Sequence, residues 1–170
     1  MLYIIAAFDE NFNIGKNNKI PWHFSEDLLH FKKKTEDNVC IMGKNTWESL
    51  PKKYRPLPNR KNIVVSKTYK DNPDLLFIDK NSFELFSVAS LNEAIIFSLN
   101  LFPNKDYYLI GGERIYREAI MQNLVDGFII THVKGIYEGD VKFPEIDFSS
   151  MNSNKIMEND NIKIVEYKYD

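Results

Sequence analysis

The sequence has one cysteine and three histidines among its 170 residues, and these small numbers exclude several kinds of site. Cys40 cannot form an intrachain disulfide, and within the apolar run "VCIM" we expect it to be buried as a small hydrophobic residue. His23, His30 and His132 lack the spacing of metal ligands, so we expect no metal. No Ser-His-Asp or Cys-His arrangement for nucleophilic catalysis can be recognised either.

The sequence also lacks a strong charge and a long apolar run. Its net charge of -2 gives no electrostatic reason to bind nucleic acid or an anionic membrane, and the run from Lys32 to Lys34 is typical of a solvated helix end. The opening "MLYIIAAF" has no basic region before it and ends at Asp9, well short of the ~20 residues that span a bilayer. We therefore expect a cytoplasmic monomer with no membrane or nucleic-acid partner.

The composition indicates one folded domain, residues 1–170. A hydrophobic content of 44% and an aromatic content of 14% are sufficient for a real core, whereas 170 residues are too few for two comfortable domains. The stretch "PKKYRPLPNR" at 51–60 contains three prolines and is predicted to be an exposed loop, and 68–83 is the least readable part of the chain.

Hydrophobic periodicity predicts an α/β fold. Helical patterns separate most of the apolar strand-like runs, which is typical of a sheet with parallel crossovers, whereas the last third has strands without intervening helices. We expect a single-domain, mostly parallel twisted central sheet of about eight strands, with an antiparallel C-terminal edge and about four flanking helices. The predicted strands are 2–8, 39–42, 62–66, 75–78, 84–88, 107–111, 127–133 and 162–169, and the predicted helices are 25–34, 45–50, 91–101 and 114–121.

Two junctions join an apolar strand through glycine to a helix. They are "VCIMGKNTW" at 39–47 and "YYLIGGERIY" at 107–116. The first turn of a helix offers free N–H groups to an anion, and glycine lets a phosphate approach the backbone closely. Neither junction matches the dinucleotide or P-loop glycine motifs, and each alone is more often a tight connection. Together they could hold two phosphates.

An aspartate stands among apolar residues in "IPWHFSEDLLHFKKKT" at 20–35. Phe24, Leu28 and Phe31 share one face of the predicted helix, and Asp27 lies at the edge of that face. Ser25 is a plausible N-cap, which would place Asp27 in the first turn, where a carboxylate is favoured. Taken alone, Asp27 is therefore an ordinary helix-start residue.

Several motifs in order resemble the bacterial dihydrofolate reductase family. They are "IAA…NIG…IPW…ED…F", "IMGKNTWESL", "LPNRKNIVVS", "LIGGERIY", "ITH" and "EGDVKFP", between about Ile4 and Pro144. The resemblance implies NADPH as the cofactor and dihydrofolate as the substrate. The family transfers a hydride from NADPH to C6 of the pterin, while a proton arrives at N5. This reaction supports one-carbon metabolism and thymidylate synthesis.

The resemblance gives roles to residues on the substrate side. Asp27 matches the pocket carboxylate, whose two oxygens suit the 2-amino group and N3–H of the pterin. Burial should raise its pKa. Trp22 lies near the water that would deliver the proton, and Thr131 matches the threonine that donates to the carboxylate. Arg60 matches the arginine that binds the α-carboxylate of the glutamate tail. The other matching positions are Ile5 and Ala6 in the first strand, and Leu28, Phe31, Leu50 and Leu57 around the rings.

On the cofactor side, Ala7 matches the position whose backbone amide group contacts the nicotinamide carboxamide. Ile14, Gly15 and the loop through Ile20 match the flap that closes over the nicotinamide. The two glycine junctions match the phosphate-binding turns, and in the family a cis peptide joins the glycine pair. The residues of these turns are Gly43, Lys44, Asn45 and Thr46, and then Ile110, Gly111, Gly112, Glu113, Arg114, Ile115 and Tyr116.

The sequence departs from the family pattern where the 2′-phosphate of NADPH would bind. The family commonly has an arginine after the first glycine and a pair of serines after the third strand, whereas this chain has Lys44, and Ser66 followed by Lys67. The bidentate guanidinium is lost and the charge is kept, so we still expect NADPH to be preferred over NADH. Ile20 stands where methionine or leucine is common, and the loop at 51–54 is longer than in the shorter family members.

Two alternatives stay open at this point. One is the related NADPH-dependent reductase of riboflavin biosynthesis, which shares the fold, although Asp27 and Arg60 favour folate. The other is a binding protein that keeps the fold without the chemistry, and the presence of Asp27, Trp22, Thr131 and both glycine junctions argues against it.

Overall fold

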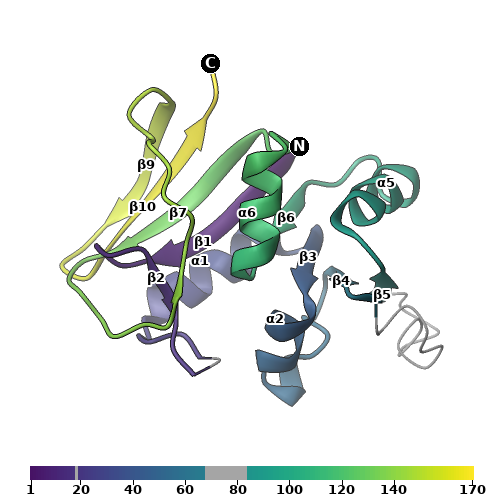
Figure 1. Cartoon of the computed structure of the whole chain (residues 1–170), viewed down its shortest axis with the longest axis horizontal. Helices are drawn as coiled ribbons and strands as arrows, with labels where there is room; N and C mark the ends of the chain where they lie inside the picture. Colours follow the sequence, from purple (N-terminus) through teal and green to yellow (C-terminus); the bar gives the residue numbers. More distant parts are fainter. Residues whose placement is uncertain (18, 68–83) are drawn as a thin grey trace.

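The computed structural model describes residues 1–17, 19–67 and 84–170, and it confirms the predicted α/β class (Figure 1). The strand predicted at 75–78 lies outside the described residues. The strands are β1 (Leu2–Phe8), β2 (Asn13–Gly15), β3 (Val39–Gly43), β4 (Lys61–Val65), β5 (Leu85–Val88), β6 (Tyr107–Leu109), β7 (Gly127–Val133), β8 (Val141–Lys142), β9 (Asn152–Glu158) and β10 (Ile162–Lys168). The helices are α1 (Ser25–Thr35), α2 (Lys44–Ser49), α5 (Leu91–Leu101) and α6 (Glu113–Met121), with a 3₁₀ turn, η1 (Lys52–Tyr54).

The central sheet has the order β5-β4-β3-β6-β1-β7-β10-β9. All neighbours from β5 to β7 pair in parallel, whereas β10 pairs antiparallel with both β7 and β9. The mostly parallel sheet with an antiparallel C-terminal edge is therefore confirmed. Because β6 returns between β3 and β1, the chain changes direction across the sheet there, which is where α/β folds bind ligands at the carboxyl ends of the strands.

The sequence patterns did not predict β2, β8 or β9. Strand β9, with the sequence "NSNKIME", forms the sheet edge and is mostly exposed, so it lacks the apolar alternation that marks a half-buried strand. Strands β2 and β8 form a small separate sheet between chain segments more than 120 residues apart. Such short strands are stabilised by the contact between the two segments, which no local pattern records.

The sheet is covered on both faces, and β1 contributes side chains to each (Figure 1). Ile4 and Phe8 belong to the core cluster that includes residues of α5 and α6. Tyr3 and Ile5 point to the opposite face and pack in the cluster that Phe24 and Phe31 join beside α1. Figure 1 shows α6 in front of the sheet and α1, drawn fainter, behind it. Cys40 is fully buried, as expected.

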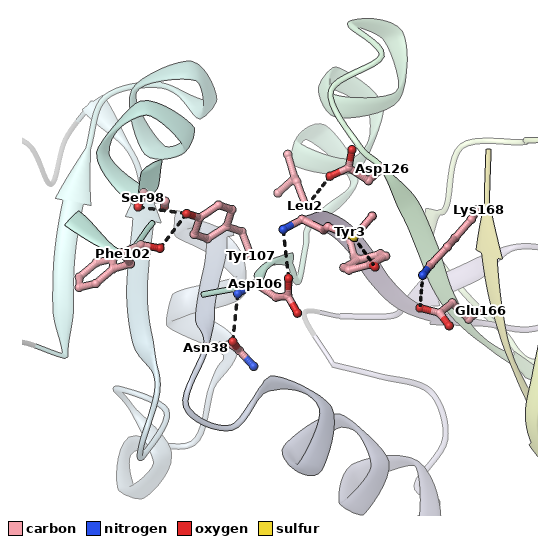
Figure 2. Close-up of polar contacts among 11 residues, drawn as sticks. Leu2, Tyr3, Asn38, Ser98, Phe102, Asp106, Tyr107, Asp126, Glu166 and Lys168 are labelled. Carbon is pink, nitrogen blue, oxygen red and sulfur yellow. Dashed lines mark hydrogen bonds and ion pairs between the residues drawn. The ribbon is translucent and has the colours of Figure 1, made fainter. Parts of the chain in front are cut away.

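Polar side chains fix the amino ends of the central strands, as Figure 2 shows. The backbone N–H of Leu2 donates to Asp126 over 2.7 Å, and the backbone N–H of Asp106 donates to the side chain of Asn38 over 3.0 Å. The hydroxyl of Tyr107 donates to the carbonyl of Phe102 at 2.7 Å. We therefore expect a ligand site at the other end of these strands, where their carboxyl ends lie.

Two local expectations were wrong. Ser25 does not cap α1, because the N-cap is Phe24, which makes no side-chain cap hydrogen bond, and Ser25 is already helical. Helix α1 begins at Ser25, where the predicted helix 25–34 begins, and Phe24 packs against the cluster beside it. The stretch 51–60 is only partly an exposed loop, since Leu57 and Arg60 are buried.

No helix among residues 1–17, 19–67 and 84–170 is long and apolar enough to cross a membrane.

Candidate active site

Asp27 lies in the first turn of α1 and faces the sheet. The hydroxyl of Thr131, on β7, donates to Oδ1 of Asp27 over 2.6 Å. Thr131 is directly opposite Ala7 of β1 in the strand register, so the contact is made across the face that α1 covers. Burial raises the pKa of Asp27 above its ordinary value, and the hydrogen bond from Thr131 opposes that rise. The result is a half-buried carboxyl group with an elevated pKa.

Trp22 is buried in the same core cluster as Ile5. Its ring packs edge-on against Tyr137, with 5.4 Å between ring centroids. The indole Nε1 is buried and has no hydrogen-bond partner among the described residues. Since a buried donor without a partner is unfavourable, this atom is suited to hold a water molecule or a polar ligand atom.

The two glycine turns lie against each other at the carboxyl ends of β3 and β6. The backbone N–H of Gly43 donates to the carbonyl of Gly111 over 2.8 Å, and the Gly111–Gly112 peptide is cis, as the resemblance implied. Gly111 has a φ of 125°, which side chains rarely tolerate, and an added Cβ would lie 3.2 Å from Oγ1 of Thr46. A Cβ on Gly112 would also meet that oxygen, at 3.4 Å. Glycine at these two positions therefore lets the hydroxyl of Thr46 pack directly against the backbone of the turn.

A hydrogen bond from α6 connects this turn to the first strand. The hydroxyl of Tyr116, which is buried, donates to the carbonyl of Ile5 at 3.0 Å. Ile110, just before the glycine pair, packs against the cluster that contains Ile5 and Trp22 and also against the cluster that contains Leu57. Phe31 of α1 joins the same two clusters. Phe31 of α1 and Ile110, the residue before the glycine pair, therefore connect these two clusters.

Arg60 is 6% exposed, although a charged residue in a loop is usually solvated. Its Nε donates to the carbonyl of Pro58 at 2.9 Å, and one terminal nitrogen donates to Oγ1 of Thr35 at 3.1 Å. The guanidinium also lies over the ring of Phe31, 5.9 Å from its centroid. Burial lowers the pKa of Arg60 without threatening its charge. These contacts hold the guanidinium of Arg60 against α1 in a fixed orientation.

The remaining predicted positions divide by exposure. Leu57 is buried, and Leu50 is half-buried against the core cluster that contains Leu57. Leu28, in contrast, is 49% exposed on α1. Ile20 is also exposed, on the loop after β2. Ala6, Ala7, Ile14, Gly15, Lys44, Thr46, Ser66 and Glu113 are half-buried, Ile115 is buried, and Asn45, Lys67 and Arg114 are exposed. Lys44 lies 3.9 Å from Glu48, one helical turn on, and Glu113 pairs with Arg117.

Sequence reasoning missed the residues that tie the loop after β1 to the loop after β7. The buried Asp9 accepts hydrogen bonds from the backbone N–H groups of Asn13 and Tyr137, at 2.9 and 2.7 Å. Burial would raise the pKa of Asp9, but these donors hold it below its ordinary value. Asp140 accepts from the backbone N–H of Asn17 at 3.0 Å. For Asp140 the sequence did contain a signal, because it is the acid beside glycine in the "EGD" of the predicted loop segment "EGDVKFP".

These observations define a class. The fold is a mostly parallel α/β sheet with two adjoining glycine turns at the carboxyl ends of β3 and β6. An acid of raised pKa faces the sheet from α1, and a buried arginine directly precedes β4. Glycine turns that lead into helices at this edge are typical of α/β enzymes that bind an anionic ligand. Among residues 1–17, 19–67 and 84–170, no three histidine, cysteine or acidic side chains are grouped closely enough to bind a metal.

Comparison with known proteins gives the family. The dihydrofolate reductase family model matches residues 1–170. Similar proteins include the dihydrofolate reductases of Neisseria gonorrhoeae, 40% identical over 85% of this chain and 79% of the relative, and of Buchnera aphidicola, 39% identical over 84% and 78%. The dihydrofolate reductase of Ureaplasma parvum is 34% identical over 98% of this chain and 96% of its own length.

The chain therefore belongs to the dihydrofolate reductase family. It is an oxidoreductase, and its reaction is the reduction of dihydrofolate to tetrahydrofolate. The resemblance inferred from the sequence motifs is confirmed.

Proposed function

We propose that this chain uses NADPH as its hydride donor and reduces dihydrofolate at C6 with protonation at N5. One observation carries the proposal. It is the half-buried Asp27, whose pKa is raised by burial and which accepts a hydrogen bond from Thr131 on the face of the sheet that Phe31 and Ile110 also pack against. NADPH, when bound, supplies the hydride.

The chain's glycine turns fit the diphosphate of such a cofactor. The turns carry no side chain at Gly43, Gly111 or Gly112, and α6 begins beside them at Glu113, where its first N–H groups would meet an anion. Lys44 and Thr46 lie in the adjoining helix α2 and would contribute charge and a hydroxyl. We assign Ser66, Lys67, Asn45 and Arg114 to the outer part of this site, where they would meet the adenosine side.

Asp27 would bind the 2-amino group and N3–H of the pterin through its two oxygens. Thr131 orients this carboxyl group by donating to one of them. Because Asp27 itself is not expected to reach N5, the proton would pass through a water held near the unpaired Nε1 of Trp22. The protein thus binds the ring, orients it and controls one proton.

The rest of the substrate would lie along α1 towards Arg60. Leu28 and Phe31 on one side and Leu50 and Leu57 on the other would contact the rings, and the exposed half of Leu28 gives an apolar surface for this purpose. Arg60 would bind the α-carboxylate of the glutamate tail with its remaining donors. Ile5, Ala6 and Ala7 would present backbone groups to the pterin and the nicotinamide, and Ile14, Gly15 and Ile20 would belong to the loop that closes over both.

The direct test mixes purified protein, NADPH and dihydrofolate and follows the loss of NADPH absorbance. We expect turnover that depends on both compounds. A protein that binds both by calorimetry and shows no turnover would be the non-catalytic binding protein considered above. A protein that oxidises NADPH with the pyrimidine substrate of riboflavin biosynthesis and not with dihydrofolate would refute the assignment.

Lys44→Arg tests the cofactor preference. Lys44 stands where the family commonly has arginine, and a guanidinium binds a phosphate bidentately where an ammonium cannot. We expect the variant to raise the ratio of kcat/KM for NADPH to that for NADH by about three- to ten-fold. Lys105→Arg is a matched control because Lys105 is exposed before β6, at the opposite end of the strands from the proposed cofactor site. An unchanged ratio in Lys44→Arg would remove Lys44 from the 2′-phosphate site.

We further propose that residues 1–170 act as one domain and as a monomer in the cytoplasm. The single, fully buried cysteine suits a reducing compartment, and the near-neutral net charge offers nothing to nucleic acid. Light scattering of the purified protein tests the state of association, and a mass of twice 20.0 kDa would contradict the monomer.

A further inference from the structure

The loop that joins β7 to β8, residues 134–140, places one aromatic side chain against the core. Every residue of this loop is exposed except Tyr137, which is half-buried and packs against the cluster beside α1. Its ring meets the indole of Trp22 edge-on, with 5.4 Å between the ring centroids and 65° between the ring planes. Because the positive edge of one ring is attracted to the negative face of the other, such a contact orients both rings.

The orientation of Trp22 depends on side-chain packing. Trp22 lies between β2 and α1, in the segment 20–24 that belongs to no helix or strand. Its buried Nε1 has no hydrogen-bond partner among the described residues, so no bond within this part of the protein fixes the plane of the indole. The indole has a single N–H, which points outward in the ring plane. The rings that contact Trp22 therefore decide where this N–H points.

Tyr137 is itself held in place through its backbone. Its N–H donates to Oδ2 of Asp9 over 2.7 Å, and its carbonyl accepts from Nδ2 of Asn13 over 3.0 Å. Asp9 is 3% exposed and Asn13 is 4% exposed, so water does not compete for these two bonds. The backbone of Tyr137 is therefore fixed on both sides of its Cα, and its ring cannot move away from Trp22 without a loss of buried hydrogen bonds.

Asp9 is a rigid anchor because both of its oxygens accept two hydrogen bonds. Oδ1 accepts from the backbone N–H groups of Asn11 and Asn13, at 2.9 Å each. Oδ2 accepts from Nδ2 of Asn13 at 3.0 Å and from the backbone N–H of Tyr137. Hydrogen bonds to a charged acceptor are stronger than those between neutral groups. The loop after β1 thus fixes Tyr137, and Tyr137 contacts the indole.

We propose that Tyr137 is a positioning residue for the proton step, because its ring, anchored by Asp9 and Asn13, sets the direction of the Trp22 Nε1–H. This rests on the proposed function, since it requires that a water held by this N–H passes the proton to N5. Tyr137 acts only through Trp22 and contacts neither dihydrofolate nor NADPH. Loss of its ring therefore slows protonation and leaves the binding of both compounds unchanged.

The test compares Tyr137→Leu with Tyr137→Phe. Leucine removes the ring but keeps an apolar side chain and both backbone bonds, so the fold should survive. Phenylalanine keeps the ring, which makes the contact with Trp22. In single-turnover measurements we expect hydride transfer to be about 10- to 100-fold slower with leucine, the range for a misplaced reacting group, and unchanged with phenylalanine. The Kd values of NADPH and folate should be those of the wild type in both variants.

Isotopes separate a slow proton step from a slow hydride step. In Tyr137→Leu the rate should be more sensitive to D₂O than in the wild type, and less sensitive to deuterium at the transferred position of NADPH. A residue that only supports the fold, or only aligns the cofactor, would lower the rate without increasing the effect of D₂O. That outcome, or a wild-type rate in Tyr137→Leu, would overturn the proposal.

The position of the indole can be observed directly by NMR of ¹⁵N-labelled protein, because the chain has two tryptophans and Trp47→Phe assigns their signals. The Trp22 Nε1–H signal should shift in Tyr137→Leu and stay in place in Tyr137→Phe.

Ile136→Ala is the matched control, because it shortens an apolar side chain that is 65% exposed in the same loop. It should behave as the wild type in every measurement, and a rate lowered as in Tyr137→Leu would contradict a specific role for Tyr137. If the wild type does not reduce dihydrofolate, the proposed function fails and this proposal fails with it. If the wild type turns over and Tyr137→Leu matches it, only this proposal fails.

Discussion

Asp27→Asn should lower kcat/KM for dihydrofolate at neutral pH by about 100- to 10,000-fold, which is the range for loss of a group that manages a proton. Asparagine keeps the size of the side chain and an oxygen that can accept from Thr131, so the fold should survive. Asparagine, however, carries no negative charge and does not exchange a proton as the acid does. Steady-state kinetics measures kcat/KM, and a thermal melt followed by circular dichroism shows whether the variant is folded. A wild-type kcat/KM in the variant would contradict the role of Asp27.

The pH dependence of the wild-type enzyme follows from the raised pKa of Asp27. Below this pKa the carboxyl group holds a proton, and above it the proton is lost. Because the reaction takes up a proton at N5, we expect the rate of hydride transfer to fall as pH rises through the pKa of Asp27. The fall should be absent in Asp27→Asn, and a flat wild-type profile between about pH 5 and pH 9 would contradict the model of proton supply.

Thr131→Val gives an independent check on the same acid. The hydroxyl of Thr131 lowers the pKa of Asp27 by donating to its charged form, so its removal leaves burial as the dominant effect. The pKa of Asp27 should rise further, and the fall in rate should move to higher pH. A purely structural role for Thr131 would change stability and leave the midpoint of the profile in place.

Arg60→Lys should raise the KM for dihydrofolate by about 10- to 100-fold while kcat changes little. The guanidinium already donates to Pro58 and Thr35, and a lysine ammonium cannot keep both contacts and also bind a carboxylate with two parallel hydrogen bonds. Fluorescence titration of folate binding gives the affinity directly. A dihydropterin without the p-aminobenzoyl-glutamate tail should be reduced equally well by wild type and variant.

Arg117→Lys is the control for this substitution, because Arg117 is exposed on α6 and paired with Glu113. It should leave both substrates unaffected. An Arg60→Lys variant that loses affinity for the truncated pterin as well would show that Arg60 supports the pocket wall through Phe31, and not the tail. Unchanged affinity for folate would refute the assignment altogether.

Helix α1 illustrates how much of the site could be predicted. Its period and its acidic first turn are local properties, and they located the helix to within one residue. The bond from Thr131 to Asp27 joins residues 104 positions apart, and it exists because β7 pairs with β1 beneath α1. The motif resemblance indicated that bond, whereas the residue pattern alone placed Asp27 only at a helix start.

Arg60 and β9 illustrate the opposite cases. A charged residue in a proline-rich loop is expected at the surface, and only the packing of Thr35 and Phe31 around its guanidinium explains its burial. The polar sequence of β9 lacks the alternation of apolar and polar residues that predicts a strand. The segment is a strand because it pairs with the edge strand β10, and this pairing does not depend on apolar side chains of its own.

The sequence by itself determined the alternating strands and helices, the two glycine junctions and the identity of the chemical groups, because these depend on short-range periodicity and on residue type. The tertiary structure decided which of those groups meet. Desolvation of Asp27, the contact between Gly43 and Gly111 and the burial of Arg60 all arise between residues that are close in the fold and distant in the chain. Their energies depend on surroundings that form only when the sheet is complete.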